Sequence, residues 1–426
     1  MGRRRIRAGL ALLAVLVVVA AAMLARRTDT AGVLRTMVVG PNPSGVVVDG
    51  RAARAFVLDG NGTMSVLDTR SGTLLRQVAV GRASALALDA RTERVFVVNA
   101  YIMYAGGNGT VSVFDAHTWR LLRTVPVGHL PYALAIDERA GRVFVLNVSS
   151  TINSGGPVSV LDATSGRLLR TMYAGPNGGP LIAPFTLTVD ARHGRLLVIT
   201  GGLINNEPGT ALAVLNTHSG RLVRAPRIQP APNGVAVDEE TNRSFIAGYG
   251  VLDIVETTSG RVLRHVPVSQ RFGALVDGRR GRLYMGSPTG VSILNAATGA
   301  TLRAVALGQY PAVPMAVDEQ TGHVVAAIMG PTDANDMPTG YGHVDVLDGR
   351  TGAVLRAVTV GVGPRAVAID ARTGHAFITT SGGAISVPDT WGWIPSSLRR
   401  WIPFLPPPGS HLRTIPGSVS MLDVRG

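Results

Sequence analysis

Residues 111–147, VSVFDAHTWRLLRTVPVGHLPYALAIDERAGRVFVLN, contain one full cycle of the pattern that decides the fold. Four short apolar runs, enriched in β-branched residues, alternate with turns in which Asp, Thr, Pro and Gly recur. Runs of this length and composition predict β-strands joined by tight turns. The predicted strands cover residues 111–115, 121–128, 131–137 and 142–147.

The same cycle occurs eight times along the chain, at intervals of 39 to 53 residues. A period near 40 to 50 residues is typical of a four-stranded propeller blade. Each first strand ends in an aspartate, namely Asp49, Asp89, Asp137, Asp190, Asp238, Asp277, Asp318 and Asp370, and a basic residue follows five positions later, namely Arg54, Arg94, Arg142, Arg195, Arg243, Arg282, His323 and His375. The pattern therefore predicts an all-β fold of eight four-stranded blades.

The turn between the third and fourth strands has its own signature, as in Asp162-Ala-Thr-Ser-Gly166. The glycine can adopt the positive φ that such a turn needs, and the aspartate side chain can accept hydrogen bonds from the backbone amides of the turn. Third strands are predicted to end at Asp68, Asp115, Asp162, Asn216, Glu256, Asn295, Asp348 and Asp423, and each fourth strand contains an arginine, at positions 35, 76, 123, 170, 224, 264, 303 and 356.

The two ends of the repeat region complement each other. The region begins with a fourth strand at residues 33–39 and stops with a third strand at residues 419–423. We expect the first strand to complete the last blade, because this closes the ring and leaves no free sheet edge.

Units such as Val111-Ser-Val-Phe-Asp115 followed by Leu121-Leu-Arg-Thr-Val-Pro-Val-Gly128 resemble the repeat of bacterial YVTN-type β-propellers. The resemblance covers about residues 33–426. It implies a propeller fold. It does not imply one function, since similar propellers include binding proteins, lyases and redox subunits.

The N-terminal 32 residues have a different character. Four arginines precede an uncharged apolar run over residues 8–25, and Arg26 and Arg27 follow it. The run predicts an apolar helix that is either a long signal peptide or a short membrane anchor. Of the two, we slightly favour an uncleaved anchor. The arginines before the run predict that the chain after it is exported. The predicted organisation is thus a targeting or anchoring segment (1–32) and a single propeller domain (33–426).

Every long insertion is predicted to fall in a connection between a second and a third strand, over residues 101–108, 148–157, 201–209, 330–342 and 381–417. In a propeller these connections share one face, here called the decorated face, with the connections between fourth and first strands. Long loops in compact domains are often functional. We therefore expect ligand-binding residues on this face, with candidates Tyr101, Tyr104, His129, Asn205, Asp333, Asp336, His343, Trp391, Trp393 and Trp401.

The insertion 381–417 contains three of the four tryptophans and the run Pro403-Phe-Leu-Pro-Pro-Pro408. Its aromatic rings beside Arg399 and Arg400 suit a membrane interface or a lid over a ligand. The alternative, which we weigh more heavily, is a loop that packs these rings onto its own propeller and caps the central channel.

Residues suited to catalysis are few. The absence of cysteine excludes disulfides, thiolate metal sites, covalent haem, iron–sulfur clusters and cysteine nucleophiles. His129, His343, Asp333 and Asp336 could together bind a metal, but they lack a short fixed spacing, so we assign no catalytic residue, metal or cofactor.

Net charge gives little support for nucleic-acid binding. All 41 basic residues other than histidine are arginine, and the formal net charge is +14. Six arginines flank the apolar N-terminal run, and fourteen more occupy the repeat positions, where they are distributed around the ring. A nucleic-acid site would instead concentrate charge on one face with interleaved aromatic residues.

The sequence favours an exported, membrane-anchored propeller that binds a small molecule or protein on its decorated face. Two alternatives stay open, namely a metal-assisted enzyme of the lyase or lactonase kind and a cell-envelope scaffold. The ligand and the oligomeric state are not specified by the sequence.

Overall fold

A computed structural model describes residues 32–100, 108–148, 157–173, 184–204, 207–229, 232, 234–248, 250–268, 272–308, 312–332, 340–388 and 410–425. The predicted N-terminal helix and most of the Trp- and Pro-rich insertion lie outside these residues. Among the described residues the only helix is the short 3-10 turn η2 (Gly278–Arg280), and none is long and apolar enough to cross a membrane.

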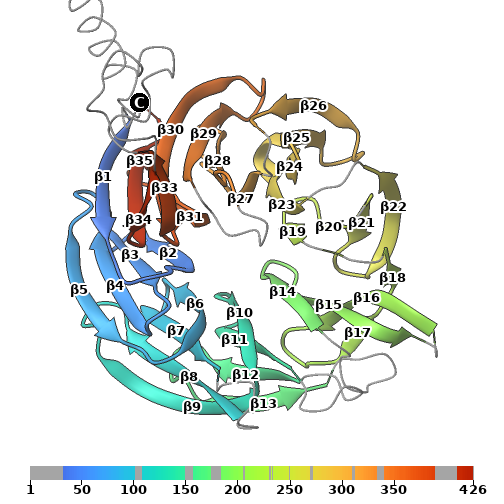
Figure 1. The fold of residues 1–426 in the computed structure, drawn as a ribbon. Coiled ribbons are helices and arrows are strands. Elements are labelled where there is room, and N and C mark those ends of the chain that lie inside the picture. Colours follow the sequence, from blue (N-terminus) through green and yellow to red (C-terminus); the bar gives the residue numbers. More distant parts are fainter. Residues whose placement is uncertain are drawn as a thin grey trace, which may run out of the picture.

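The described strands form eight four-stranded antiparallel sheets around a central axis, with first strands innermost and fourth strands outermost (Figure 1). Blades 1 to 4 are β2 (Gly45–Asp49), β3 (Arg54–Leu58), β4 (Thr63–Asp68) and β5 (Leu74–Ala79); β6 (Ala83–Asp89), β7 (Arg94–Asn99), β8 (Asn108–Asp115) and β9 (Leu121–His129); β10 (Pro131–Asp137), β11 (Arg142–Asn147), β12 (Val158–Asp162) and β13 (Leu168–Met172); and β14 (Pro184–Asp190), β15 (Arg195–Ile204), β16 (Glu207–Asn216) and β17 (Leu222–Arg224), with β18 (Arg227–Ile228) added beside β16.

Blades 5 to 8 are β19 (Gly234–Asp238), β20 (Arg243–Ala247), β21 (Val251–Glu256) and β22 (Arg261–Pro267); β23 (Phe272–Asp277), β24 (Arg282–Ser287), β25 (Gly290–Asn295) and β26 (Thr301–Ala306); β27 (Ala312–Val317), β28 (His323–Ile328), β29 (Tyr341–Asp348) and β30 (Val354–Val362); and β31 (Pro364–Asp370), β32 (His375–Thr380), β35 (Ser418–Asp423) and β1 (Val33–Val38). The predicted eight blades of four strands are confirmed.

Apolar side chains pack between neighbouring blades, so the core is divided among the seams of the ring. Both faces of a middle strand are buried because each sheet lies against two others, and Phe56 in β3 is fully buried. At the seam between blades 1 and 2, for example, Phe56 and Met64 pack with Val95 and Phe114. Fourth strands such as β5 are mostly exposed. Stability therefore depends on every blade contacting both neighbours.

The ring closes as the repeat phase predicts. Strand β1 pairs with β35 in the last blade, and Met37 lies opposite Val419. Both side chains are buried in one cluster with Phe377 of blade 8 and with Val46 and Ala55 of blade 1. The two ends of the described chain are therefore joined in one sheet.

The repeat signatures have the predicted local roles. In blade 3, Asp137 lies opposite Arg142 across the first hairpin. In the turn after β12, Gly166 has φ 68°. The Asp162 carboxylate accepts hydrogen bonds from the backbone N–H groups of Thr164 at 3.2 Å and Ser165 at 2.8 Å.

Three details of the connections differ from the sequence prediction. The predicted loop over residues 201–209 is wrong, because β15 and β16 continue as a paired ribbon in which Gly202 lies opposite Gly209. The insertion 381–417 contains a strand pair, β33 (Gly383–Pro388) and β34 (Ser410–Ile415). Long connections are also not confined to second-to-third links, since residues 173–183 join the fourth strand β13 to the first strand β14.

Candidate functional site

The two faces of the ring differ in how uniform their connections are. Turns from first to second and from third to fourth strands form one face, here called the plain face, and each contains four or five residues. Connections on the decorated face range from the single residue Leu130 to the 37 residues 381–417. The additional link 173–183 also belongs to the decorated face, so the one-sided distribution of long connections holds.

Most predicted site residues fall outside the described chain. This applies to Tyr101, Tyr104, Asn205, Asp333, Asp336, Trp391, Trp393 and Trp401. The two described candidates lie at the decorated ends of different blades, with His129 at the end of β9 in blade 2 and His343 near the start of β29 in blade 7. These blades are not neighbours, and no hydrogen bond or ion pair within the described chain links the two histidines.

His343 lies close to a buried carboxylate on the decorated face. Its Nε2 lies 3.6 Å from Oδ2 of Asp345 and 3.3 Å from the carbonyl oxygen of Leu307 in the preceding blade. Asp345 is buried, whereas the His343 side chain is about one-third exposed. The hydrogen bond with Asp345 raises the pKa of His343 and outweighs the opposing effect of burial. A half-buried imidazole held by a carboxylate can store a proton or transfer one.

Aligning the blades reveals a signal that the sequence analysis missed. The position three residues before the end of the third strand is serine in five blades, namely Ser65, Ser112, Ser159, Ser292 and Ser420, but aspartate in blades 5 and 7. Both aspartates, Asp253 and Asp345, are buried and each has a histidine partner. In blade 5, Nδ1 of His265 lies 2.6 Å from Asp253. Because His265 lies on the outermost strand β22, only the Asp345 pair belongs to the decorated face.

Polar side chains at the ends of second strands lie beneath the decorated face. Asn147 donates from Nδ2 to the carbonyl oxygen of Pro157 at 2.8 Å and to Oγ of Ser159 at 3.1 Å. Gly128, which leaves the previous blade, lies against this amide, where an added Cβ would come within 2.7 Å of Asn147 Cγ. The recurrent glycine at strand exits thus leaves room for a polar side chain of the next blade.

Several arginines on the plain face connect consecutive blades. Arg54 of blade 1 donates to the carbonyl oxygen of His117 in blade 2 at 2.8 Å. Arg170 of blade 3 donates to that of His218 in blade 4 at 2.6 Å. Although Arg94 lies opposite Asp89 in the hairpin, its ion-pair partner is Asp115 on the third strand, at 2.9 Å. The repeat arginines therefore contribute to assembly of the ring.

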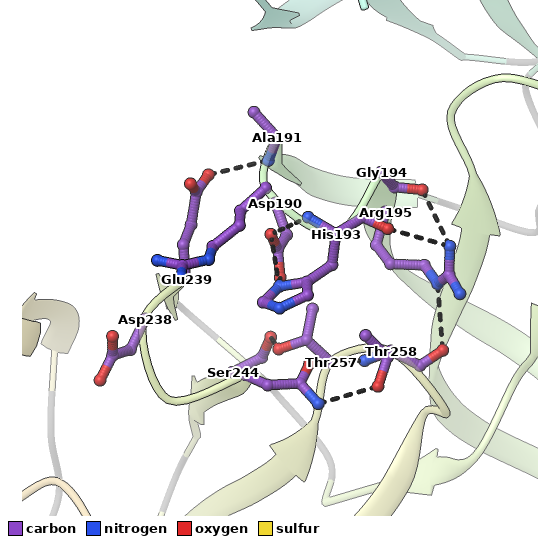
Figure 2. A network of polar contacts seen from close by, with 12 residues as sticks. Asp190, Ala191, His193, Gly194, Arg195, Asp238, Glu239, Ser244, Thr257 and Thr258 are labelled. Carbon is purple, nitrogen blue, oxygen red and sulfur yellow. Dashed lines mark hydrogen bonds and ion pairs between the residues drawn. The ribbon is translucent and has the colours of Figure 1, made fainter. Parts of the chain in front are cut away.

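Figure 2 shows one such junction, between blades 4 and 5. The buried Asp190 carboxylate contacts Nδ1 of His193 at 2.9 Å, and Arg195 donates from Nε to the carbonyl oxygen of Thr258 at 3.0 Å. Ser244 is bonded to Thr257 at 2.7 Å, not to His193. The group thus resembles a hydrolytic triad in composition but not in connectivity, and its role is structural.

Two pockets lie on the plain face. One, of about 420 Å³, lies between blades 6 and 7 and contains three arginines. The other, of about 270 Å³, is mainly acidic and includes Glu239, Glu240 and Glu319. Within the described ranges, no group of three or more histidines and acidic residues is arranged to hold a metal ion.

Comparisons with known proteins identify the fold and no family. No protein-family model matches the chain, and no curated protein matches it. Among solved structures, it is similar to the dihydro-heme d1 dehydrogenase NirN in complex with DHE, with a TM-score of 0.62 and 14% identity over 93% of this chain and 80% of that chain.

Two further structures give the same result. The computationally designed protein Ika8 has a TM-score of 0.61 and 16% identity, over 82% of this chain and 96% of the designed one. Kuenenia stuttgartiensis hydrazine synthase has a TM-score of 0.53 and 16% identity, over 80% of this chain and 93% of that chain. At such low identity the likeness concerns architecture alone. The chain is an eight-bladed β-propeller repeat protein.

Proposed function

We propose that this chain is an exported, membrane-anchored propeller of the YVTN type that binds a small molecule or partner protein on its decorated face. The single observation that carries the proposal is the asymmetry of the two faces. Plain-face turns contain only four or five residues, whereas the decorated connections vary from one residue to 37. Connections that serve only to join strands have no physical reason to grow on one face.

The tether is supported by the sequence of residues 1–32 together with the position of β1. Strand β1 begins at Val33, opposite Leu422 near the plain-face end of β35. A chain that leaves a membrane just before Val33 would reach the propeller at its plain face. The decorated face would then point away from the bilayer, toward ligands in the extracytoplasmic space.

Shortening the large insertion tests the binding role. Pro388 lies opposite Ser410 at the end of the β33–β34 pair, so replacing residues 389–409 with Asn-Gly should close a two-residue hairpin and preserve the register. A photo-crosslinking amino acid at Tyr341, which is exposed at the decorated end of β29, reports partners of that face. The same group at Arg279, on the plain face, is the matched control.

The full-length protein is cross-linked in cells of its own host and its adducts are identified by mass spectrometry. We expect a discrete adduct from position 341 that is absent from position 279 and absent after the loop replacement. Native mass spectrometry of the uncross-linked protein tests for a small molecule that is lost with the loop. Identical adducts at both positions, or adducts and bound mass unaffected by the replacement, would contradict the proposal.

The enzyme alternative has one observation in its favour, the His343–Asp345 pair. If His343 acts as a base, the variant His343→Gln should abolish turnover in a panel of lactones and polysaccharide lyase substrates while leaving the melting temperature nearly unchanged. Activity retained by this variant would exclude the pair from catalysis.

A further inference from the structure

The pocket between blades 6 and 7 lies on the plain face, opposite the proposed binding face. It is lined by Arg280, Arg282, Thr321, Gly322, Asp348, Gly349 and Arg350 and has a volume of about 420 Å³. Sites for small molecules typically range from roughly 300 to 1,000 Å³. Its walls come from the first hairpin of blade 6, the first hairpin of blade 7, and the turn after β29.

Arg282 lacks the partners that its counterparts in blades 1 to 4 have. In blades 2 and 3, Arg94 and Arg142 form ion pairs with aspartates that end the third strands, at 2.9 Å and 3.5 Å. The corresponding residue opposite Arg282 is Asn295, which carries no charge.

The second kind of partner for this arginine is a backbone carbonyl oxygen in the next blade, and next to Arg282 that acceptor is already bonded to another side chain. Arg54 of blade 1 bonds to the turn that begins at Ala116. For Arg282 of blade 6 the equivalent acceptor is Gly349 of blade 7, and its carbonyl oxygen accepts instead from the hydroxyl of Tyr284, at 3.2 Å. Across the ranges that the structure describes, the Arg282 guanidinium has no hydrogen-bond or ion-pair partner.

Arg350 is the second arginine of this pocket whose side chain has no hydrogen-bond or ion-pair partner in the described part of the chain. Its backbone N–H donates to Asp348 at 2.9 Å, but its exposed guanidinium is not engaged. Arg280, in contrast, is fixed by Asp277 at 2.9 Å and by the carbonyl oxygens of Glu319 and Gln320, both at 3.0 Å. The pocket thus has one arginine that forms its wall and two that are available to a ligand.

The donor geometry indicates which anion fits. A guanidinium offers two parallel N–H donors, so Arg282 and Arg350 together can present four donors to one oxyanion. A carboxylate has two oxygens, whereas a phosphate monoester has three terminal oxygens and a charge near −2. Asp348 stays ionised, because hydrogen bonds from Thr351 and Arg350 lower its pKa. Its charge repels any anion in the pocket, and a dianion most, so the attraction must come from the three arginines of the lining.

We propose that this pocket binds a phosphate group, held by Arg282 and Arg350 against the wall formed by Arg280. The phosphate belongs either to a soluble phosphate ester or to a lipid headgroup. The side chains of Leu302, Val354 and Leu355 are about half exposed on the outer strands of the same two blades, as are leucines on other fourth strands, and a lipid chain could lie against them. This inference does not depend on the function proposed for the decorated face.

Calorimetric titration of the purified full-length protein in detergent with inorganic phosphate, at constant ionic strength maintained with chloride, tests the site. We expect saturable binding that weakens at least tenfold in Arg282→Gln and in Arg350→Gln. Neither substitution removes a side-chain hydrogen bond or ion pair between described residues, so both variants should melt like the wild type. The control Arg279→Gln removes the same charge one residue from Arg280, at an exposed ion pair with Glu319, and should bind phosphate within twofold of the wild type.

The proposal is overturned if phosphate gives no saturable heat beyond that of chloride, or if all four proteins bind it equally. The same titration with glycerol 3-phosphate and with dihexanoyl phosphatidic acid distinguishes the two sources. If the natural ligand is a soluble ester, the two compounds should bind with equal affinity. If it is a lipid headgroup, the phosphatidic acid should bind more tightly. In either case Arg282→Gln should abolish the binding. An affinity for phosphatidic acid that Arg282→Gln leaves intact would place lipid binding elsewhere and count against the pocket.

Discussion

Replacing Arg425 with methionine removes a guanidinium that ties the last blade to its neighbour. Arg425 follows β35 and donates from Nε and Nη2 to the carboxylate of Asp318 in blade 7, at 2.8 Å and 3.1 Å. It also donates to the carbonyl oxygen of Ala371 at 2.6 Å. The Asp318 side chain is fully buried and that of Arg425 is 24% exposed. The substitution therefore leaves a buried carboxylate without its counter-charge.

The expected loss follows from what remains around Asp318. Breaking a buried ion pair from one side costs about 3 to 5 kcal/mol. Asp318 keeps hydrogen bonds from the Gln320 amide at 3.2 Å and the Thr321 hydroxyl at 3.0 Å, so we expect a smaller cost of about 2 to 3 kcal/mol. With an unfolding entropy of roughly 0.8 kcal/mol/K for a domain of this size, the melting temperature should fall by about 3 °C.

The loss should depend on pH in one direction. Burial alone would raise the pKa of Asp318, but hydrogen bonds from Arg425, Gln320 and Thr321 outweigh it and hold this pKa below its usual value of 3.8. A carboxyl whose pKa is lowered on folding contributes stability that is complete above its unfolded pKa and is lost as the pH falls through the folded pKa. The difference between wild type and Arg425→Met should thus be full at pH 7 and shrink below about pH 4.

Urea denaturation at pH 7, 5 and 3, followed by circular dichroism, measures this difference. Arg279→Met is the control, because it breaks an exposed ion pair with Glu319 at 3.7 Å and should change stability by no more than about 1 kcal/mol. The reasoning is refuted if Arg425→Met is as stable as wild type at pH 7, or if its deficit is undiminished at pH 3.

Two further substitutions test the junctions. Thr69→Val removes the hydroxyl of blade 1 that donates to the buried Asp370 of blade 8 at 2.5 Å, and the free energy of unfolding should fall by about 1 to 3 kcal/mol. Thr69→Ser keeps a hydroxyl and should retain most of that stability. Equal stability of all three proteins would contradict this. Gly322→Ala and Gly281→Ala both place alanine at positive φ, 81° and 59°, and this backbone strain should lower the stability of each variant by about 1 kcal/mol. Only the Gly322 substitution brings Cβ within 2.5 Å of Arg280 Nε, so urea titration should show it to be the more destabilised by about 1 to 2 kcal/mol.

The architecture could be predicted because it depends on signals that repeat. The eight aspartates with a basic residue five positions later fix the first hairpin of each blade, and the spare strand at residue 33 fixes closure. Local interactions within 40 to 50 residues specify the hairpins, whereas closure pairs strands from the two ends of the repeat region. A single blade would give an ambiguous signal, but eight in phase do not.

The connections and the site were less predictable because they depend on contacts between blades. Gly201 and Gly209 favour a loop by local propensity, yet the pairing of β15 with β16 extends through both. The arginines are recognisable as repeat positions, but their carbonyl partners lie in the next blade. The absence of a partner for Arg282 follows from two separate differences, Asn295 in its own blade and the Tyr284 hydroxyl at Gly349. The substitution of Asp345 for serine, in contrast, was visible in the sequence once the blades were aligned.

Disulfide cross-linking of β1 to β35 tests the central claim, a ring closed by pairing the N-terminal strand with the C-terminal blade. Thr36 lies opposite Ser420 in that pair, and the chain has no other cysteine. The double variant Thr36→Cys/Ser420→Cys should oxidise to an intramolecular disulfide in near-quantitative yield, seen by mass spectrometry. It should gain up to roughly 6 kcal/mol of stability from closing so long a loop. The control Thr36→Cys/Ser65→Cys places the second thiol at the same position of blade 1 and should stay reduced. A reduced Thr36→Cys/Ser420→Cys variant, or cross-linking as efficient in the control, would contradict the closed ring.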